Sequence, residues 1–227
     1  PIDSWATTDA ELTALTAKAL DFATVFGVDV TEAVQRAGSF VENGLARDAT
    51  HAFDLMVDSA QRVPAAMRGD LLEAADEYGK HLAGLGFTGE EAFALLVEAS
   101  KKGPIALDKA GDAIKEFQIR STDMSATSVD AYKAIGLNAE EMAGKLLAGG
   151  ETARGGFDEI VDGLLAIKDP VKRANTSIAL FGVPLEDMAV NEIPGFLSSL
   201  NDLDGGFGDV TGKAAELPGR WYDSLLD

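Results

Sequence analysis

The sequence predicts an all-α fold, a compact multi-helix domain of about 9–11 helices joined by helix-turn-helix corners. The first observation is compositional: alanine and leucine together number 61 of 227 residues against 23 for valine plus isoleucine, a bias that favours helices over strands. The second is periodicity, because apolar residues recur at steps of three and four along the chain. No segment of comparable length alternates with the period of two of a half-buried strand.

The first helix is expected over residues 8–26. Thr8 and Glu11 have the spacing of a capping box, and an apolar stripe follows them at helical spacing. Similar stripes predict helices within residues 49–63, 72–82, 106–117 and 157–165.

The breaks between helices share a short sequence motif, which begins with a glycine at positions 27, 86, 136 and 182. In each, the glycine can take the left-handed conformation that ends one helix and an apolar residue packs down. A polar cap, or a proline with acids, then opens the next helix. The glycines lie 59, 50 and 46 residues apart, a drift too large for a strict solenoid. We interpret the motif as a reused corner, with internal duplication as the alternative.

One large domain or two lobes both fit the length of the chain. The polar run from Arg120 to Ser125 suggests lobes of residues 1–120 and 121–203. Beyond Leu203 the composition becomes rich in glycine and aspartate, so residues 204–227 are expected to form a flexible linker or tail. The first residue is Pro1 and no signal peptide is recognisable, so we expect a segment of a longer protein.

Charge and cysteine content exclude several classes of function. With 38 acidic against 19 basic residues the net charge is -19, which disfavours direct nucleic-acid binding and adsorption to anionic lipid. The absence of cysteine excludes disulfides and thiolate zinc sites. The longest apolar run has six residues where a membrane-spanning helix needs about 20, so no transmembrane segment is expected in this chain.

Two glycine-rich motifs resemble ligand sites. Residues 84–89 match the G-x-G-x-x-G pattern of dinucleotide-binding folds, but a helix rather than a strand is expected before them, so we interpret them as a corner. Residues 202–209 have acid spacing reminiscent of a calcium loop, yet the glycine and glutamate that an EF-hand requires are not at their positions. The sequence therefore predicts neither a cofactor nor a metal site.

Candidate catalytic groups are few. The acidic pairs Glu90-Glu91 and Glu140-Glu141 fall in first helical turns, where carboxylates favour the helix dipole. The two histidines, at 51 and 81, are expected to be solvated or stabilised by the helix dipole. The serines at 39, 59 and 100 lack a nucleophile-elbow context, and the methionines at 56, 142 and 188 are expected to fill the core. We therefore predict no catalytic residues and no enzymatic activity.

The segments that carry a resemblance are residues 44–56, 76–93, 108–117, 134–142, 149–150 and 168–188. Their order and spacing resemble the tail tape measure proteins of siphophages and prophages from actinobacteria. The resemblance spans about residues 20–190 and supplies no catalytic residue. It implies part of a long protein that fills the tail tube, sets tail length while tube subunits polymerise around it, and leaves ahead of the genome at infection.

The resemblance also implies partners and a location. Tail tube and tail-tip proteins are the expected partners, with tail assembly chaperones and a host envelope component as further candidates. The expected location is the interior of the virion tail tube, and the host cytoplasm during assembly. Such proteins often carry peptidoglycan-cleaving modules and long hydrophobic segments, and this chain shows neither.

The chain departs from a simple ruler. A continuous helix of 227 residues would reach about 340 Å, but 24 glycines and 7 prolines interrupt it. A compact helical domain would contribute little to the length measurement. The alternative function is a stand-alone acidic helical adaptor or immunity-like interaction protein.

Overall fold

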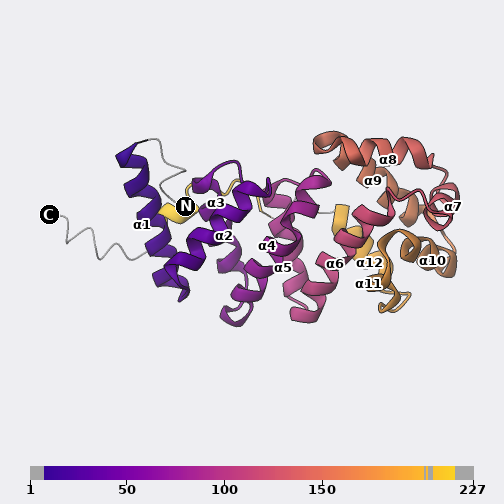
Figure 1. Cartoon of the computed structure of the whole chain (residues 1–227). Coiled ribbons are helices and arrows are strands. Elements are labelled where there is room, and N and C mark those ends of the chain that lie inside the picture. Colours follow the sequence, from indigo (N-terminus) through magenta and orange to yellow (C-terminus); the bar gives the residue numbers. More distant parts are fainter. Residues whose placement is uncertain (1–7, 202, 204–206, 218–227) are drawn as a thin grey trace.

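The structure is a computed structural model of the chain, and it describes residues 8–201, 203 and 207–217. These residues form helices and loops with no strand, which confirms the predicted all-α class (Figure 1). They contain twelve α-helices, one more than the upper end of the expected range, because the four-residue α11 is too short to show a periodicity.

The α-helices are α1 (Asp9–Phe26), α2 (Val30–Glu42), α3 (Ala49–Arg62), α4 (Arg68–Gly84), α5 (Gly89–Ser100), α6 (Pro104–Arg120), α7 (Ala126–Ala134), α8 (Ala139–Ala148), α9 (Gly150–Ala166), α10 (Pro170–Phe181), α11 (Val183–Glu186) and α12 (Ile193–Asn201). Single 3₁₀ turns are η2 (Ala65–Met67) and η3 (Lys213–Ala215).

The start of α1 is the predicted capping box. The hydroxyl of Thr8 accepts a hydrogen bond from the Glu11 amide at 3.2 Å, and the Glu11 carboxylate accepts one from the Thr8 amide at 3.0 Å. Two donors that the first helical turn leaves without intrahelical partners are thereby satisfied.

All four corner glycines have positive φ, between 70° and 82°. At Gly86 and Gly136 the glycine amide and the next amide both return to carbonyls of the preceding helix, which is the Schellman pattern. Gly182 differs, because its ψ of -156° lies outside the left-handed helical region and Val183 after it is 55% exposed. The expectation that an apolar residue packs down is therefore wrong at this fourth corner, where the proline of α11 follows at once.

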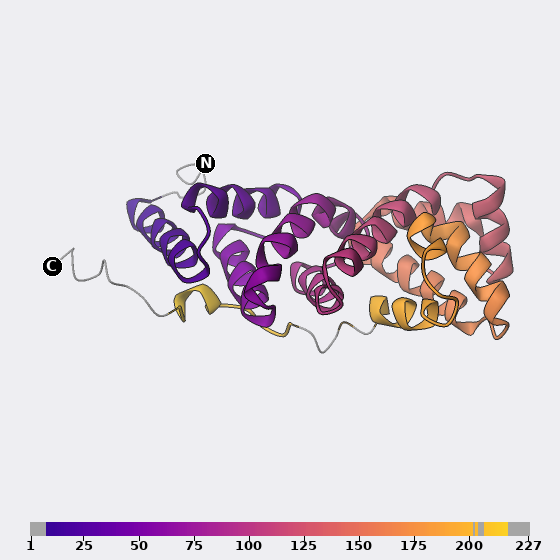
Figure 2. The same cartoon turned by 90° about the horizontal axis from the view of Figure 1, so that it is seen from below.

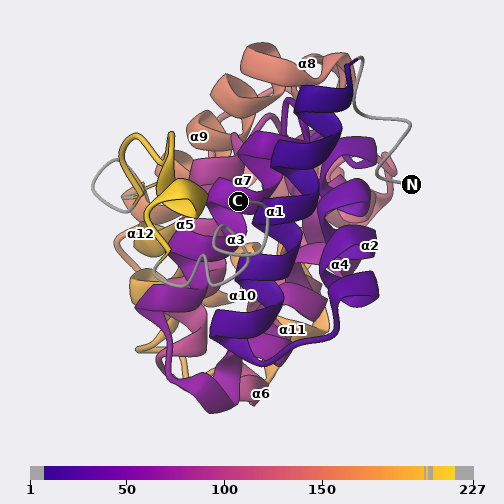
Figure 3. The same cartoon turned by 90° about the vertical axis from the view of Figure 1, so that its left-hand side faces the viewer.

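The helices are stacked along one direction, with α1 at one end and α7, α8 and α10 at the other (Figures 1 and 2). α6 packs against α4, α5, α10 and α11, and so it belongs to both halves of the stack. Seen along the stack, α1 lies in front of α3 and beside α2 (Figure 3).

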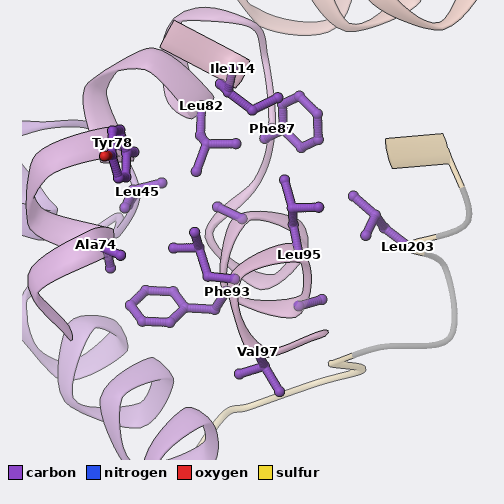
Figure 4. Packing of buried hydrophobic residues seen from close by; sticks show 14 of the residues in the cluster. Leu45, Ala74, Tyr78, Leu82, Phe87, Phe93, Leu95, Val97, Ile114 and Leu203 are labelled. Carbon is purple, nitrogen blue, oxygen red and sulfur yellow. The ribbon is translucent and has the colours of Figure 1, made fainter. Parts of the chain in front are cut away.

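One cluster of buried apolar side chains runs through the whole stack. The ring of Phe117, in the first predicted lobe, lies 5.0 Å from that of Phe157 and 4.6 Å from that of Phe181, both in the second. Around α5 the buried Phe93 and Leu95 sit between neighbouring helices, and Leu203 extends toward Leu95 from the segment after α12 (Figure 4). The lobes 1–120 and 121–203 therefore share a core, and their independence as folding units stays a prediction.

Residues 207–217 of the expected flexible end fold back onto the helices, and the flexibility of this end stays a prediction. Four of their apolar side chains are buried against the first half of the stack, most completely Val210 and Ala214 at 1% exposed. Composition concealed this packing because the buried residues stand singly among glycines and polar residues. Residues 204–206 and 218–227 of the predicted tail lie outside the described residues.

Candidate functional site

Both histidines lie where the sequence placed them along their helices, but His51 is not solvated. Its imidazole is 4% exposed, in the first turn of α3 against the first turn of α5. Nδ1 accepts the Arg47 amide at 3.3 Å, so Nε2 carries the proton and donates to Glu90 at 2.9 Å. His81 on α4 contacts Gln118 on α6, with 2.6 Å between Nδ1 and Oε1. Both imidazoles join neighbouring helices.

The three serines singled out from the sequence bond to groups other than the histidines. Ser39 donates to the carboxylate of Asp76 on α4. Ser59 and Ser100 donate to carbonyls three residues earlier in their own helices, at 3.0 and 2.7 Å. The structure brings no nucleophile and base together among these candidates.

The acidic pairs lie in first helical turns, as predicted. Glu91 closes a capping box with Thr88 and also faces the Arg154 guanidinium of α9 at 3.4 Å. Glu141 lies 3.3 Å from Lys145 on α8. Nothing in the local sequence marks the contact between Arg154 and Glu91, because these residues are 63 positions apart.

The G-x-G-x-x-G segment is the corner between α4 and α5. A Cβ on Gly86 would lie 2.1 Å from the Gly150 carbonyl oxygen, and one on Gly89 would lie 2.2 Å from that of Leu45. These glycines let helix ends approach other backbone closely, and that space is already filled by protein. Half of the calcium-loop candidate lies outside the described residues, which include Leu203 and residues 207–209 of it.

A groove of about 880 Å³ lies between α5, α6 and the segment from α11 through α12. Apolar groups, including Leu95, Ile105, Met188 and Phe196, line it. Ile105 is 73% exposed, whereas Met188 is partly buried and packs against the apolar core, as expected, while also lining the groove. The groove could not be predicted from the sequence because its walls come from separate segments of the chain. The apolar Ile105 directly after Pro104, at the start of α6, is a weak sign of an exposed apolar surface.

One pair of charged groups faces across this groove. The ammonium of Lys109 on α6 lies 3.5 Å from the carboxylate of Asp187, with both side chains partly exposed. Glu98, Lys102 and Glu192 also line the groove. An apolar surface with alternating charges fits contact with another polypeptide better than proton transfer or phosphate binding.

A second hollow of about 340 Å³, between α4 and α6, is acidic. The hydroxyl of Tyr78 faces Asp108 at 3.0 Å and Asp112 at 3.2 Å. Burial, together with these carboxylates, raises the pKa of Tyr78 far above its usual value, so the phenol stays protonated and acts as a donor. Asp70, Glu73 and Glu77 add negative charge to the same hollow.

Neither a membrane-spanning helix nor a metal-binding cluster occurs in the part of the chain that the structure describes. No helix there has the length and apolar character needed to cross a bilayer. No cluster of three or more histidine, aspartate or glutamate side chains there is arranged to hold a metal ion.

Comparisons with known proteins agree with the resemblance. No solved structure matches the chain. The "Probable tape measure protein" of Streptomyces phage phiC31 is 37% identical over 171 residues, which cover 75% of this chain and 23% of that protein. The chain thus spans about a quarter of the length of the curated relative it matches. Residues 6–182 match the family model of phage-related minor tail proteins, and because this match covers most of the sequence, the chain belongs to that family.

Proposed function

We propose that this chain is a non-enzymatic helical part of a phage tape measure protein that acts through protein contacts. The match of residues 6–182 to the minor tail protein family carries the proposal. The functions proposed are tail assembly, a part in tail-length determination, and genome delivery. Tail tube and tail-tip proteins are the proposed partners, with assembly chaperones and a host envelope component as further ones.

The side-chain chemistry supports action by contact. His51, His81 and Ser39 bond to side chains of neighbouring helices, and Ser59 and Ser100 bond to carbonyls of their own helices. The groove between α5, α6 and α12 offers apolar surface with charges of both signs at its edge. The family membership favours this proposal over the stand-alone adaptor.

The proposed location is the interior of the virion tail tube, and the host cytoplasm during assembly. The net charge of -19 supports it, because a strongly acidic chain is repelled by the DNA that follows it through the tube.

The stacked fold supports a small contribution to tail length. A single helix of 227 residues would extend about 340 Å, whereas here the described chain reverses direction at each corner. We therefore expect the segment to act mainly through its surfaces and not as a linear spacer.

The test is an in-frame deletion of this segment from a phage genome that encodes it, with synonymous recoding of the same codons as the control. We expect fewer infectious particles and a change in tail length well below about 340 Å, measured by plaque titre and electron microscopy. Normal tails with full infectivity would contradict the proposed function. Shortening by the full helical length would show instead that the segment acts as a spacer.

A further inference from the structure

Residues 207–217, here called the strap, lie along α1 and α3 although they follow α12 in the chain (Figures 2 and 3). The strap contains one 3₁₀ turn, η3, and is otherwise irregular. Four of its apolar side chains are buried, at 1–5% exposed: Phe207, Val210, Ala214 and Leu217.

Asp54 holds the backbone of the strap. Its side chain, on α3, is 1% exposed. One carboxylate oxygen accepts the Gly212 amide at 2.9 Å and the other accepts the Ala214 amide at 2.8 Å. Lys18 of α1 lies 3.6 Å away. Burial of a carboxylate is costly unless such donors replace water, so the strap supplies what the Asp54 carboxylate needs.

Phe207 anchors the other end of the strap. Its ring lies 4.4 Å from the guanidinium carbon of Arg62, and 6.5 Å from the ring of Phe93 on α5. The guanidinium is in turn oriented by Asp58, one helical turn earlier, at 2.6 Å. The Phe207 ring is thus held in a site formed by Arg62 and Asp58 of α3 and Phe93 of α5.

The strap is attached in the manner of a bound peptide. Its remaining backbone bonds among the described residues are internal, from Lys213 to Val210, from Ala215 to Gly212 and from Glu216 to Lys213. Side-chain anchors in apolar sites, with a polar group that reads the backbone, are the elements of peptide recognition. Nothing in this arrangement requires the covalent connection to α12.

We propose that the face formed by α1, α3 and α5 is a peptide-binding site that the strap fills in cis, and that the strap leaves and rebinds it while the helices stay folded. The site recognises a segment with an aromatic residue followed, five and seven positions later, by the two amides of a tight turn that Asp54 binds. The strap of a second copy has the same chemistry, so the site can also be filled in trans. This inference does not depend on the proposed function.

Native-state hydrogen exchange on the unmodified full chain tests whether the strap opens separately. We expect the Gly212 and Ala214 amides to exchange at least about tenfold faster than interior amides of α3 and α5, with rates that low urea leaves unchanged. Exchange of both sets at one rate, with one urea dependence, would show that the strap opens only on global unfolding and would overturn the proposal.

A binding experiment tests the site itself. The full chain carrying Phe207→Ala and Leu217→Ala has a weakened cis strap, and a fluorescent peptide of residues 207–217 is titrated onto it and followed by anisotropy. We expect binding about tenfold or more tighter than to the unmodified chain, because the intact strap competes at high effective concentration.

Adding Asp54→Asn to that double variant tests the role of the carboxylate. An asparagine retains one acceptor oxygen but presents N–H groups to a backbone amide, so the peptide affinity is expected to fall about tenfold or more. The matched control is Asp76→Asn on α4, whose carboxylate serves Ser39 and Arg36. An equal loss of peptide affinity with Asp54→Asn and with Asp76→Asn would overturn the proposal. So would the absence of peptide binding to a double variant that has native circular dichroism. If the double variant does not fold, the hydrogen-exchange result on the unmodified chain decides.

Discussion

Two opposing effects decide how a substitution of Gly111, in the interior of α6, changes the stability of the fold. Glycine lowers helix stability by about 1 kcal/mol relative to alanine. A Cβ at this position, however, would lie 2.0 Å from the nearest ring atom of Tyr78. That ring is buried and its hydroxyl is held by Asp108 and Asp112, so it has little room to move aside.

We therefore expect Gly111→Ala to lower the free energy of unfolding by about 1–3 kcal/mol, the usual cost of overpacking. The matched control is Gly155→Ala on α9, an exposed helical position where a Cβ would meet nothing within 4 Å. In Gly155→Ala no steric clash offsets the higher helix propensity of alanine, so the free energy of unfolding should rise by up to about 1 kcal/mol. Urea denaturation of both variants checks the prediction, and equal changes in the two would contradict it.

Asp29, the N-cap of α2, contributes to the stability of the fold in a pH-dependent way. The backbone amide of Glu32, with further bonds from Thr31, lowers the pKa of its carboxyl below the ordinary value of 3.8. Because the folded pKa is lowered, the charged form stabilises the fold above the unfolded pKa, and this stability is lost as pH falls through the folded pKa.

We expect the unmodified chain to melt at a higher temperature than Asp29→Asn near pH 6, and the gap to narrow by about pH 2.5. Asparagine also caps helices but has no charge to lose, so the comparison isolates the carboxylate. Thermal melts across this range measure the gap. A gap that stays constant with pH would show that the cap acts without its charge.

At the scale of elements, the corners between helices were predictable because their chemistry is local. A glycine with positive φ and a polar cap two residues on can be read from a few neighbouring letters. What those letters omit is the other chain segment that meets each corner. Gly27 and Gly86 have similar φ values of 70° and 82°, but only Gly86 faces another backbone.

This difference predicts unequal costs for the same substitution. Gly27→Ala should cost about 1–2 kcal/mol, from the left-handed conformation alone. Gly86→Ala should cost at least about 2 kcal/mol more, since its Cβ would collide with the Gly150 carbonyl, which is backbone and yields only if α9 shifts. Chemical denaturation compares the two, and similar losses would contradict the close approach of α4 and α9.

At the scale of the whole molecule, the shared core bears on how the chain unfolds. The contacts among Phe117, Phe157 and Phe181 cross the boundary between the predicted lobes. Since the halves bury apolar surface against each other through α6, we expect the loss of one half to expose part of the core of the other.

We expect a single cooperative transition in urea. Phe22→Ala, in the terminal α1, should lower the free energy of unfolding by about 3–5 kcal/mol. The decrease should be the same for residues 121–203 as for residues 1–120. Hydrogen exchange followed separately in the two halves measures this. Destabilisation confined to the first half would establish the two lobes as independent units.

The sequence by itself determined the helical class, the place of the first helix and the glycine corners, because caps, periodicity and turn glycines are short-range properties. The family followed from the resemblance of ordered segments and from the family match over residues 6–182. Tertiary structure alone decided that His51 is buried against Glu90, that Arg154 joins α9 to Glu91, and that residues 207–217 pack back on α3. Asp54 and Ala214 are 160 residues apart, and nothing in either local sequence marks the other. Such pairs form because whole helices pack, and that packing depends on the summed burial of many side chains from distant parts of the chain.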